Sequence, residues 1–109
     1  MTARFDVELT AGAEGDLAAI HGWIVGQGDG AAADRFLDLL LERIERLESF
    51  PLRGAVLPEL EPLGMSEFRQ IIAAPYRIVY RVFDQRVVIT LIAHGRRDFT
   101  QLLEERLLR

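Results

Sequence analysis

The sequence predicts an α+β fold: an N-terminal strand, an α-helical hairpin packed on an antiparallel β-sheet, and a short C-terminal helix. Two segments with helical spacing of apolar residues lie in the first half of the chain, joined by a glycine-rich turn. Three segments rich in β-branched and aromatic residues lie in the second half, and their short connections imply antiparallel pairing. We expect one domain over residues 1–109, with the element order β-α-α-β-β-β-α.

The first strand and helix are indicated by two different periodicities. Apolar and polar residues alternate strictly over residues 4–9, as in a half-buried strand. Thr10 then offers an N-cap, and the helix is expected to run to about Val25. Its apolar stripe recurs at helical spacing and consists of Ala13, Leu17, Ile20 and Ile24.

A glycine-rich turn at residues 26–30 separates the first helix from the second, which we expect from about Ala31 to Ser49. Pro51 stops this helix, and prolines and glycines punctuate a loop over residues 51–66. Three strands follow, at residues 67–73, 76–83 and 86–94.

The chain is expected to end on a short helix. Asp98 and Gln101 have the spacing of a capping box, with Asp98 as the N-cap. The apolar stripe that follows is formed by Phe99, Leu102, Leu103 and Leu107.

The composition excludes several kinds of chemistry. The chain has no cysteine, which excludes a disulfide framework, a thiolate metal site and a cysteine nucleophile. Its two histidines, His21 and His94, lie far apart in the sequence and give no metal-ligand spacing. No serine sits in a nucleophile elbow, and no phosphate-binding glycine loop follows a strand. We therefore expect no cofactor, no metal and no small-molecule catalysis.

The hydropathy pattern bears on location. No apolar run approaches the roughly 18 residues that a membrane helix needs, so no membrane association is expected. The N-terminus lacks the basic start and apolar run of a signal peptide. Together with the absence of cysteine, this favours a cytoplasmic protein.

The charge is unevenly distributed. All 13 basic residues are arginines, and the net charge is −4. Residues 1–64 carry 5 arginines against 12 acids, whereas residues 65–109 carry 8 against 5. Generic nucleic-acid binders are usually basic overall, so the sequence does not fit that class. The second half of the chain could still present a local basic face.

Arginine is the functional group that stands out there. The arginines on and around the three C-terminal strands that we single out are Arg69, Arg77, Arg81, Arg96 and Arg97. Side chains alternate along a strand, so Arg77 and Arg81 are expected on one face. One interpretation is a cationic face that grips an acidic partner or a nucleic-acid backbone. The other, which spacing alone favours, is a solvated face that prevents edge-to-edge association. In either case, Arg77 or Arg81 should be partly exposed or paired with a carboxylate.

Four further residues have two interpretations each. His94 could transfer protons, but a strand-end histidine bonded to the backbone is favoured. Trp23 lies off the main stripe of its helix and could anchor a partner or pack between the helices. Leu39 and Leu41 flank the stripe of the second helix. They could pack on the first helix or stay exposed and bind a partner helix.

Several segments, taken in order, resemble one known family. They are Asp16-Leu17-x-x-Ile20, Ala32-Ala33-x-x-Phe36, Leu47-x-x-Phe50-Pro51-x-x-Gly54, Phe68-Arg69-x-Ile71, Tyr76-Arg77-Ile78-Val79-Tyr80-Arg81 and His94-Gly95-Arg96-Arg97-Asp98. Together they resemble the ParE toxins of the ParE/RelE superfamily, which belong to bacterial type II toxin–antitoxin systems. The resemblance covers nearly the whole chain and implies a helical hairpin on an antiparallel sheet.

The resemblance also implies a function and partners. It implies a plasmid-stabilisation toxin that inhibits DNA gyrase and is neutralised by a ParD-like antitoxin, which lays a C-terminal segment over it. It implies no catalytic residue and no direct sequence-specific nucleic-acid binding. The candidates for target binding or toxicity are Arg69, Arg77, Arg81, His94, Arg96 and Arg97. The candidates for antitoxin binding are Trp23, Leu39 and Leu41.

Two alternatives stay open. RelE-type relatives cut mRNA in the ribosome with a cluster of basic residues and often a C-terminal tyrosine. The chain lacks lysine and has no tyrosine after Tyr80, so it departs from that pattern. An RNase would use Arg69, Arg77, Arg81 and His94. The other alternative is a toxin-like domain that serves only as a non-toxic binding module.

Overall fold

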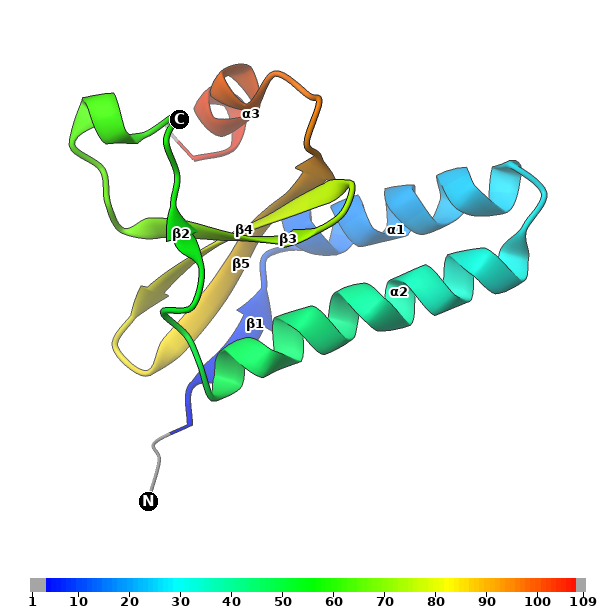
Figure 1. The fold of residues 1–109 in the computed structure, drawn as a ribbon, viewed down its shortest axis with the longest axis horizontal. Helices are drawn as coiled ribbons and strands as arrows, with labels where there is room; N and C mark the ends of the chain where they lie inside the picture. Colours follow the sequence, from blue (N-terminus) through cyan, green and yellow to red (C-terminus); the bar gives the residue numbers. More distant parts are fainter. Residues whose placement is uncertain (1–3, 108–109) are drawn as a thin grey trace.

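The computed structural model describes residues 4–107 and confirms the α+β class. Figure 1 shows the helical hairpin beside the sheet and extending beyond it. The elements are β1 (Asp6–Leu9), α1 (Ala11–Gly26), α2 (Gly30–Glu45), the 3-10 helix η1 (Arg46–Glu48), β2 (Ala55–Val56), the 3-10 helix η2 (Glu61–Leu63), β3 (Phe68–Ala73), β4 (Tyr76–Phe83), β5 (Arg86–His94) and α3 (Phe99–Arg106).

The sheet has five strands in the order β1-β5-β4-β3-β2. The three C-terminal strands pair antiparallel, as their short connections predict. The sheet is nevertheless mixed, because β1 pairs with β5 in parallel. Short connections predict antiparallel pairing, but no short connection links β1 to another strand. Its orientation could therefore not be predicted in this way. Backbone bonds from Asp6 N to Gln85 O and from Thr10 N to Ile89 O tie it to β5.

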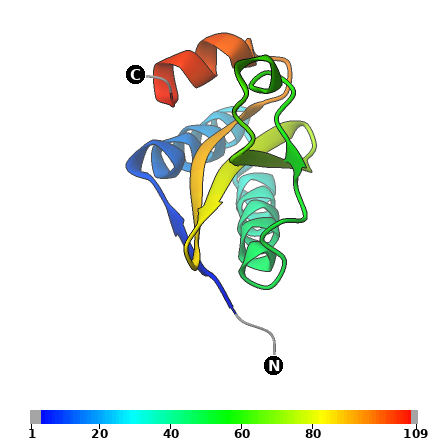
Figure 2. The ribbon, with the colours of Figure 1, turned by 90° about the vertical axis from the view of Figure 1, so that its left-hand side faces the viewer.

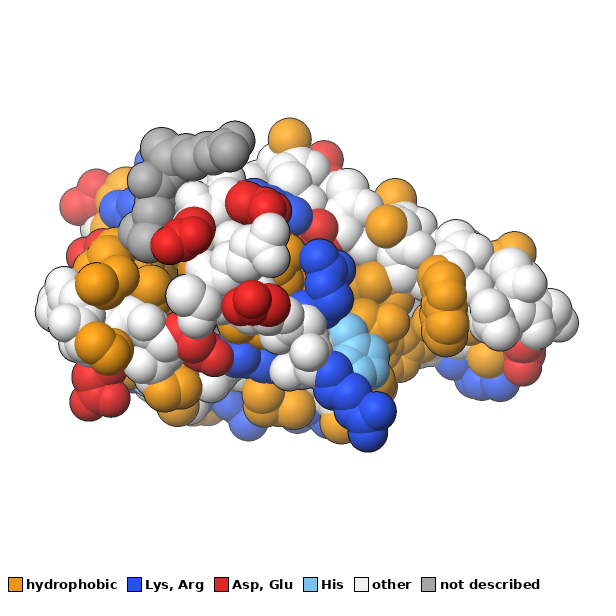
Figure 3. Space-filling view, turned by 90° about the horizontal axis from the view of Figure 1, so that it is seen from above, with side chains coloured by type: hydrophobic (Ala, Val, Ile, Leu, Met, Phe, Trp, Pro, Cys, Tyr) orange, Lys and Arg blue, Asp and Glu red, His pale blue; other side chains and the backbone are white. Residues whose placement is uncertain are grey.

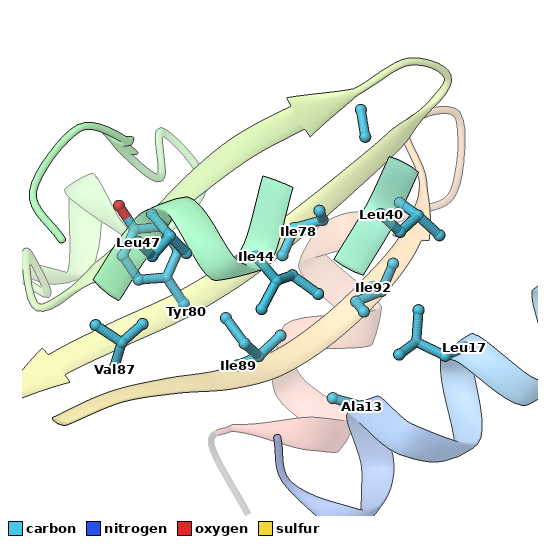
Figure 4. Packing of buried hydrophobic residues seen from close by; sticks show 11 residues of the cluster. Ala13, Leu17, Leu40, Ile44, Leu47, Ile78, Tyr80, Val87, Ile89 and Ile92 are labelled. Atoms are coloured by element: carbon cyan, nitrogen blue, oxygen red, sulfur yellow. The ribbon is translucent and has the colours of Figure 1, made fainter. Parts of the chain in front are cut away.

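A large apolar cluster lies between the helical hairpin and the sheet. Figure 4 shows Leu40 and Ile44 of α2 and Leu47 of η1 over the side chains of β4 and β5. On the sheet side the buried members are Ala73, Ile78, Tyr80, Val87, Ile89 and Ile92. This packing confirms that the hairpin covers one face of the sheet.

The opposite face is covered as well. Figure 2 shows η2 beside α3 at the end of the molecule where the chain ends. Together, α3 and the loop that carries η2 bury a second cluster formed by Leu57, Leu60, Phe68, Val79, Leu91, Ala93, Phe99 and Leu103. The sheet therefore has helices or loop on both faces.

Local capping explains where the helices begin. The side chain of Thr10 accepts from Ala13 N, and that of Asp98 accepts from Gln101 N, as predicted. Only half of the capping box forms, because the Gln101 side chain bonds to Glu105 instead. Asp29 caps α2 in the same way and was not predicted. Within residues 4–107, no helix has both the length and the hydropathy to cross a membrane.

Candidate functional site

Strand β4 carries its side chains on the two faces that alternation predicts. Tyr80 and Ile78 belong to the hairpin cluster, whereas Val79 belongs to the cluster beneath α3. Arg77 and Arg81 share the face of Val79. Both interpretations of this face left it open to solvent, whereas apolar side chains of α3 and of the loop fill the middle of it. The arginines are thereby divided into separate environments.

Arg77 is engaged inside the molecule. Its Nη1 and Nη2 donate to the two carboxylate oxygens of Glu59 at 2.9 Å each, and its Nε donates to Gln70. The guanidinium also lies 3.7 Å from the centre of the Phe99 ring. The Arg77 side chain is 13% exposed and that of Glu59 is 23% exposed. Hydrogen bonding to Arg77 lowers the pKa of Glu59, so the pair stays ionised and fastens both the loop and α3 to the sheet.

Arg69 and Arg81 lie at the end of the sheet where β4 ends. Arg69 Nη1 donates to the backbone oxygen of Gly54 at 2.8 Å. The Arg81 guanidinium lies 4.6 Å from the centre of the Phe83 ring, and its buried Nε has no hydrogen-bond partner among the residues described. Neither side chain is near His94, which pairs with Tyr76 at the opposite end of β4.

His94, Arg96 and Arg97 lie at the other end, where β5 ends. The His94 ring accepts from Arg96 N through Nδ1 at 3.1 Å and packs edge-on against Tyr76. This is the backbone-bonded strand-end histidine that the sequence favours. Arg96 and Arg97 are exposed on the turn that follows.

A groove of about 800 Å³ opens beside His94, between α1, the end of β5 and α3. Figure 3 shows histidine and arginine side chains bordering a strip of apolar side chains that continues onto the helical arm. Trp23 lines the groove and is 63% exposed. The other apolar residues of the lining include Ile20, Ile24, Tyr76, Ile92 and Leu102. We name this feature the α1–α3 groove.

An ion pair fixes the two walls of the groove. Asp16 on α1 accepts two bonds from Arg106 on α3, at 2.9 and 3.0 Å, and one from Ile92 N at 2.9 Å. Arg106 also donates to Thr90 O at 3.0 Å. Bonding to Asp16 raises the pKa of Arg106, so this guanidinium stays charged. No local pattern in the sequence indicates this pair, because its members lie 90 positions apart.

Leu39 and Leu41 lie elsewhere. Leu39 is partly buried and Leu41 is 36% exposed, so neither is fully packed inside the hairpin. Neither residue lines the α1–α3 groove. Among the three residues predicted to bind an antitoxin, Trp23 alone lies in that groove.

A second hollow, of about 580 Å³, lies at the end of the sheet where β4 turns into β5. Its lining is Phe5, Phe50, Pro51, Leu52, Arg53, Val82, Phe83 and Asp84. Tyr76, in the lining of the groove, and Phe83 mark the two ends of β4. The two hollows are therefore separated by the length of that strand, roughly 24 Å.

The part of the chain that the structure describes has no cluster of three or more metal-ligating side chains. The site is instead a pair of apolar hollows bordered by arginine, one at each end of the sheet. Such hollows, with few polar groups and large exposed side chains, are typical of surfaces that bind macromolecules. The two hollows are therefore candidate surfaces for a macromolecular partner.

Comparison with known proteins identifies the family. The sequence model of the ParE toxin of type II toxin–antitoxin systems, parDE, matches residues 7–99, and the chain belongs to this family. A structure of the chromosomal ParDE system from P. aeruginosa is similar, with a TM-score of 0.68 and 20% identity, over 84% of this chain and 97% of the other. The toxin–antitoxin complex RelBE2 from Mycobacterium tuberculosis is similar with a TM-score of 0.63 and 25% identity, over 86% and 94%. No curated protein matches the chain.

Proposed function

We propose that this toxin acts by trapping DNA gyrase and that a ParD-like antitoxin neutralises it in the bacterial cytoplasm. The supporting observation is that the residues an RNase of this fold would use do not converge. His94 of β5 pairs with Tyr76, the first residue of β4. Arg81 lies five positions further along β4, roughly 17 Å from Tyr76. Arg77 lies between them and is already bonded to Glu59.

An mRNA endonuclease needs a phosphate site next to a general acid and base. In this chain the face between the arginines is filled by apolar side chains, and His94 packs on the hairpin side against Tyr76. A gyrase poison needs no catalytic group of its own, because it traps chemistry that the target enzyme performs. The arrangement therefore supports gyrase over the ribosome as the target.

The α1–α3 groove is the surface that we assign to the antitoxin. Its walls are largely apolar, and Trp23 projects from α1 with 63% of its surface exposed. Exposed tryptophans at the centre of apolar grooves are common anchors of protein interfaces. An amphipathic antitoxin segment laid in this groove would bury Trp23 in an interface above roughly 1,000 Å².

The gyrase assignment is tested with purified proteins. Supercoiled plasmid is incubated with gyrase, ATP and the toxin, and linear DNA is measured after denaturation. We expect the toxin to increase linear DNA and the antitoxin to abolish the increase. Translating ribosomes incubated with the toxin should show no mRNA cleavage.

The His94→Ala variant tests the alternative mechanism, ribosome-dependent mRNA cleavage, in cells. We expect this variant to keep most of its toxicity, and induction to cause DNA breaks and filamentation before translation stops. Site-specific mRNA cleavage that disappears in His94→Ala would replace gyrase by the ribosome. A harmless wild-type chain would instead indicate a binding module that is not a toxin.

A further inference from the structure

The loop after η1 exposes large apolar side chains. Phe50 is 64% exposed and Leu52 is 61% exposed. Phe83, at the end of β4, is 37% exposed, and all three line the hollow of about 580 Å³. We name these three residues and their hollow the Phe50 patch. Exposed apolar side chains that gather around a hollow, rather than lying singly, indicate a docking surface.

The loop that presents this patch is held firmly. Gly54 N donates to the Tyr80 hydroxyl at 3.0 Å, and Arg69 Nη1 donates to Gly54 O at 2.8 Å and to Leu52 O at 3.4 Å. A Cβ at Gly54 would lie 2.5 Å from Gln70 O and 2.6 Å from the Tyr80 oxygen, so the close approach requires glycine. Phe50 and Leu52 are therefore exposed from an ordered loop, which lowers the entropy lost when a partner binds.

The charges around the patch indicate what the partner carries. Within residues 4–107, no carboxylate lies within ion-pair distance of Arg53, Arg69 or Arg81. Arg81 also keeps a buried Nε without a partner, next to Phe68 and Phe83. By contrast, the arginines elsewhere on the sheet and α3 are paired: Arg77 with Glu59, Arg86 with Glu8 and Arg106 with Asp16.

The same surroundings disfavour nucleic acid as the partner. Asp84 lines the hollow, and Asp6 and Glu8 lie close to Arg86 beside it. These carboxylates would repel a run of phosphates. A polypeptide that carries one or two carboxylates beside an apolar side chain fits both the arginines and the hollow.

We propose that the Phe50 patch is the surface through which this toxin binds its protein target. The target contributes an acidic segment whose apolar side chain enters the hollow and whose carboxylates pair with Arg53 and Arg81. This inference rests on the proposed function, because it requires a protein target distinct from the antitoxin. It separates target binding from the α1–α3 groove.

The test uses the double variant Phe50→Ser/Leu52→Ser, induced in bacteria without antitoxin. Leu63→Ser is the matched control, because Leu63 is also 61% exposed and lies on η2, outside the hollow. We expect the double variant to restore colony formation at least 100-fold relative to the wild type, and Leu63→Ser to remain toxic. Both should bind the antitoxin like the wild type, which also verifies that they are folded.

Arg53 supplies a second, independent variant. Arg53→Glu should reduce toxicity more than Arg53→Gln, because reversing the charge repels an acidic partner. Undiminished toxicity of both the double variant and Arg53→Glu overturns the inference but leaves the proposed function intact. A wild-type chain without toxicity overturns both.

Two further outcomes also contradict the inference. If the double variant loses antitoxin affinity together with toxicity, the patch belongs to the antitoxin interface. If the wild type binds a 30-nucleotide single-stranded DNA and the double variant does not, the partner is nucleic acid rather than an acidic polypeptide.

Discussion

The two ends of the sheet both present an apolar hollow, but their charges differ. At the α1–α3 groove, Asp16 and Arg106 satisfy each other and hold the walls together. At the Phe50 patch, Arg53, Arg69 and Arg81 have no carboxylate partner within residues 4–107. Arg97, which also lines the α1–α3 groove, has no carboxylate within ion-pair distance among residues 4–107 either, so the groove has one such arginine and the Phe50 patch has three around it. The larger number of unpaired arginines suits an acidic segment at the Phe50 patch. The difference favours two different partners, one at each end.

Arg77 lies on β4 between the two regions and fastens the loop and α3 to the sheet, so its removal should have the largest effect. Arg77→Ala leaves the carboxylate of Glu59 without its partner beneath the loop, which should lower the free energy of unfolding by about 2–4 kcal/mol. Chemical denaturation measures this loss in the free energy of unfolding. Arg35→Ala is the control, because this exposed arginine of α2 should change stability by less than about 0.5 kcal/mol. Equal effects of the two would show that Arg77 does not fasten α3 and the loop.

Gly54→Ala tests whether the Phe50 patch depends on a rigid loop. The new Cβ would lie 2.5 Å from Gln70 O and push the loop away from Tyr80. We expect a loss of about 1–3 kcal/mol in thermal or chemical denaturation, and reduced toxicity. Gly22→Ala meets no atom within 4 Å in the middle of α1 and should stabilise by about 0.5–1 kcal/mol. Unchanged stability of Gly54→Ala would refute the close approach.

The Glu59–Arg77 pair should make stability depend on pH. The pKa of Glu59 in the folded state lies below its ordinary value of 4.5. The stabilisation is therefore complete above the unfolded pKa and is lost as the pH falls through the folded pKa. Measured from about pH 6 to about pH 3, the advantage of the wild type over Glu59→Gln should shrink towards zero. An advantage that stays constant over this range would contradict the assigned ion pair.

The smallest effect is expected on the flank of α2. Leu41→Asp should leave the fold intact and weaken antitoxin binding by about fivefold, because Leu41 is 36% exposed but lies outside the groove. Leu39→Asp should behave similarly. Isothermal titration calorimetry measures both. A loss larger than that of Trp23→Ser would place the antitoxin's main anchor on the flank of the hairpin instead.

Local patterns in the sequence predicted the elements well. The bounds of β4 and β5, the caps Thr10 and Asp98, and the two faces of β4 all follow from alternation and capping chemistry. These features depend on residues a few positions apart, which is why a single sequence suffices.

What the sequence could not predict depends on distant residues. Glu59 and Arg77 lie 18 positions apart and Asp16 and Arg106 lie 90 apart, so no local pattern joins them. Leu57 and Leu60 lie in a proline-rich loop without regular spacing, and their packing over Val79 was therefore missed. Because of that packing, the face of β4 that carries Arg77 and Arg81 is filled in the middle by apolar side chains and is not open to solvent. The exposure of Phe50 and Leu52 likewise becomes visible only once the loop is placed.

We propose that the antitoxin and the target bind at opposite ends of the sheet. The most direct measurement is the affinity of the antitoxin for Trp23→Ser and for Phe50→Ser, by calorimetry under the same conditions. We expect Trp23→Ser to weaken binding by about 30-fold and Phe50→Ser to change it by less than about twofold. Equal weakening by both variants, or none by Trp23→Ser, would contradict the division between the two ends.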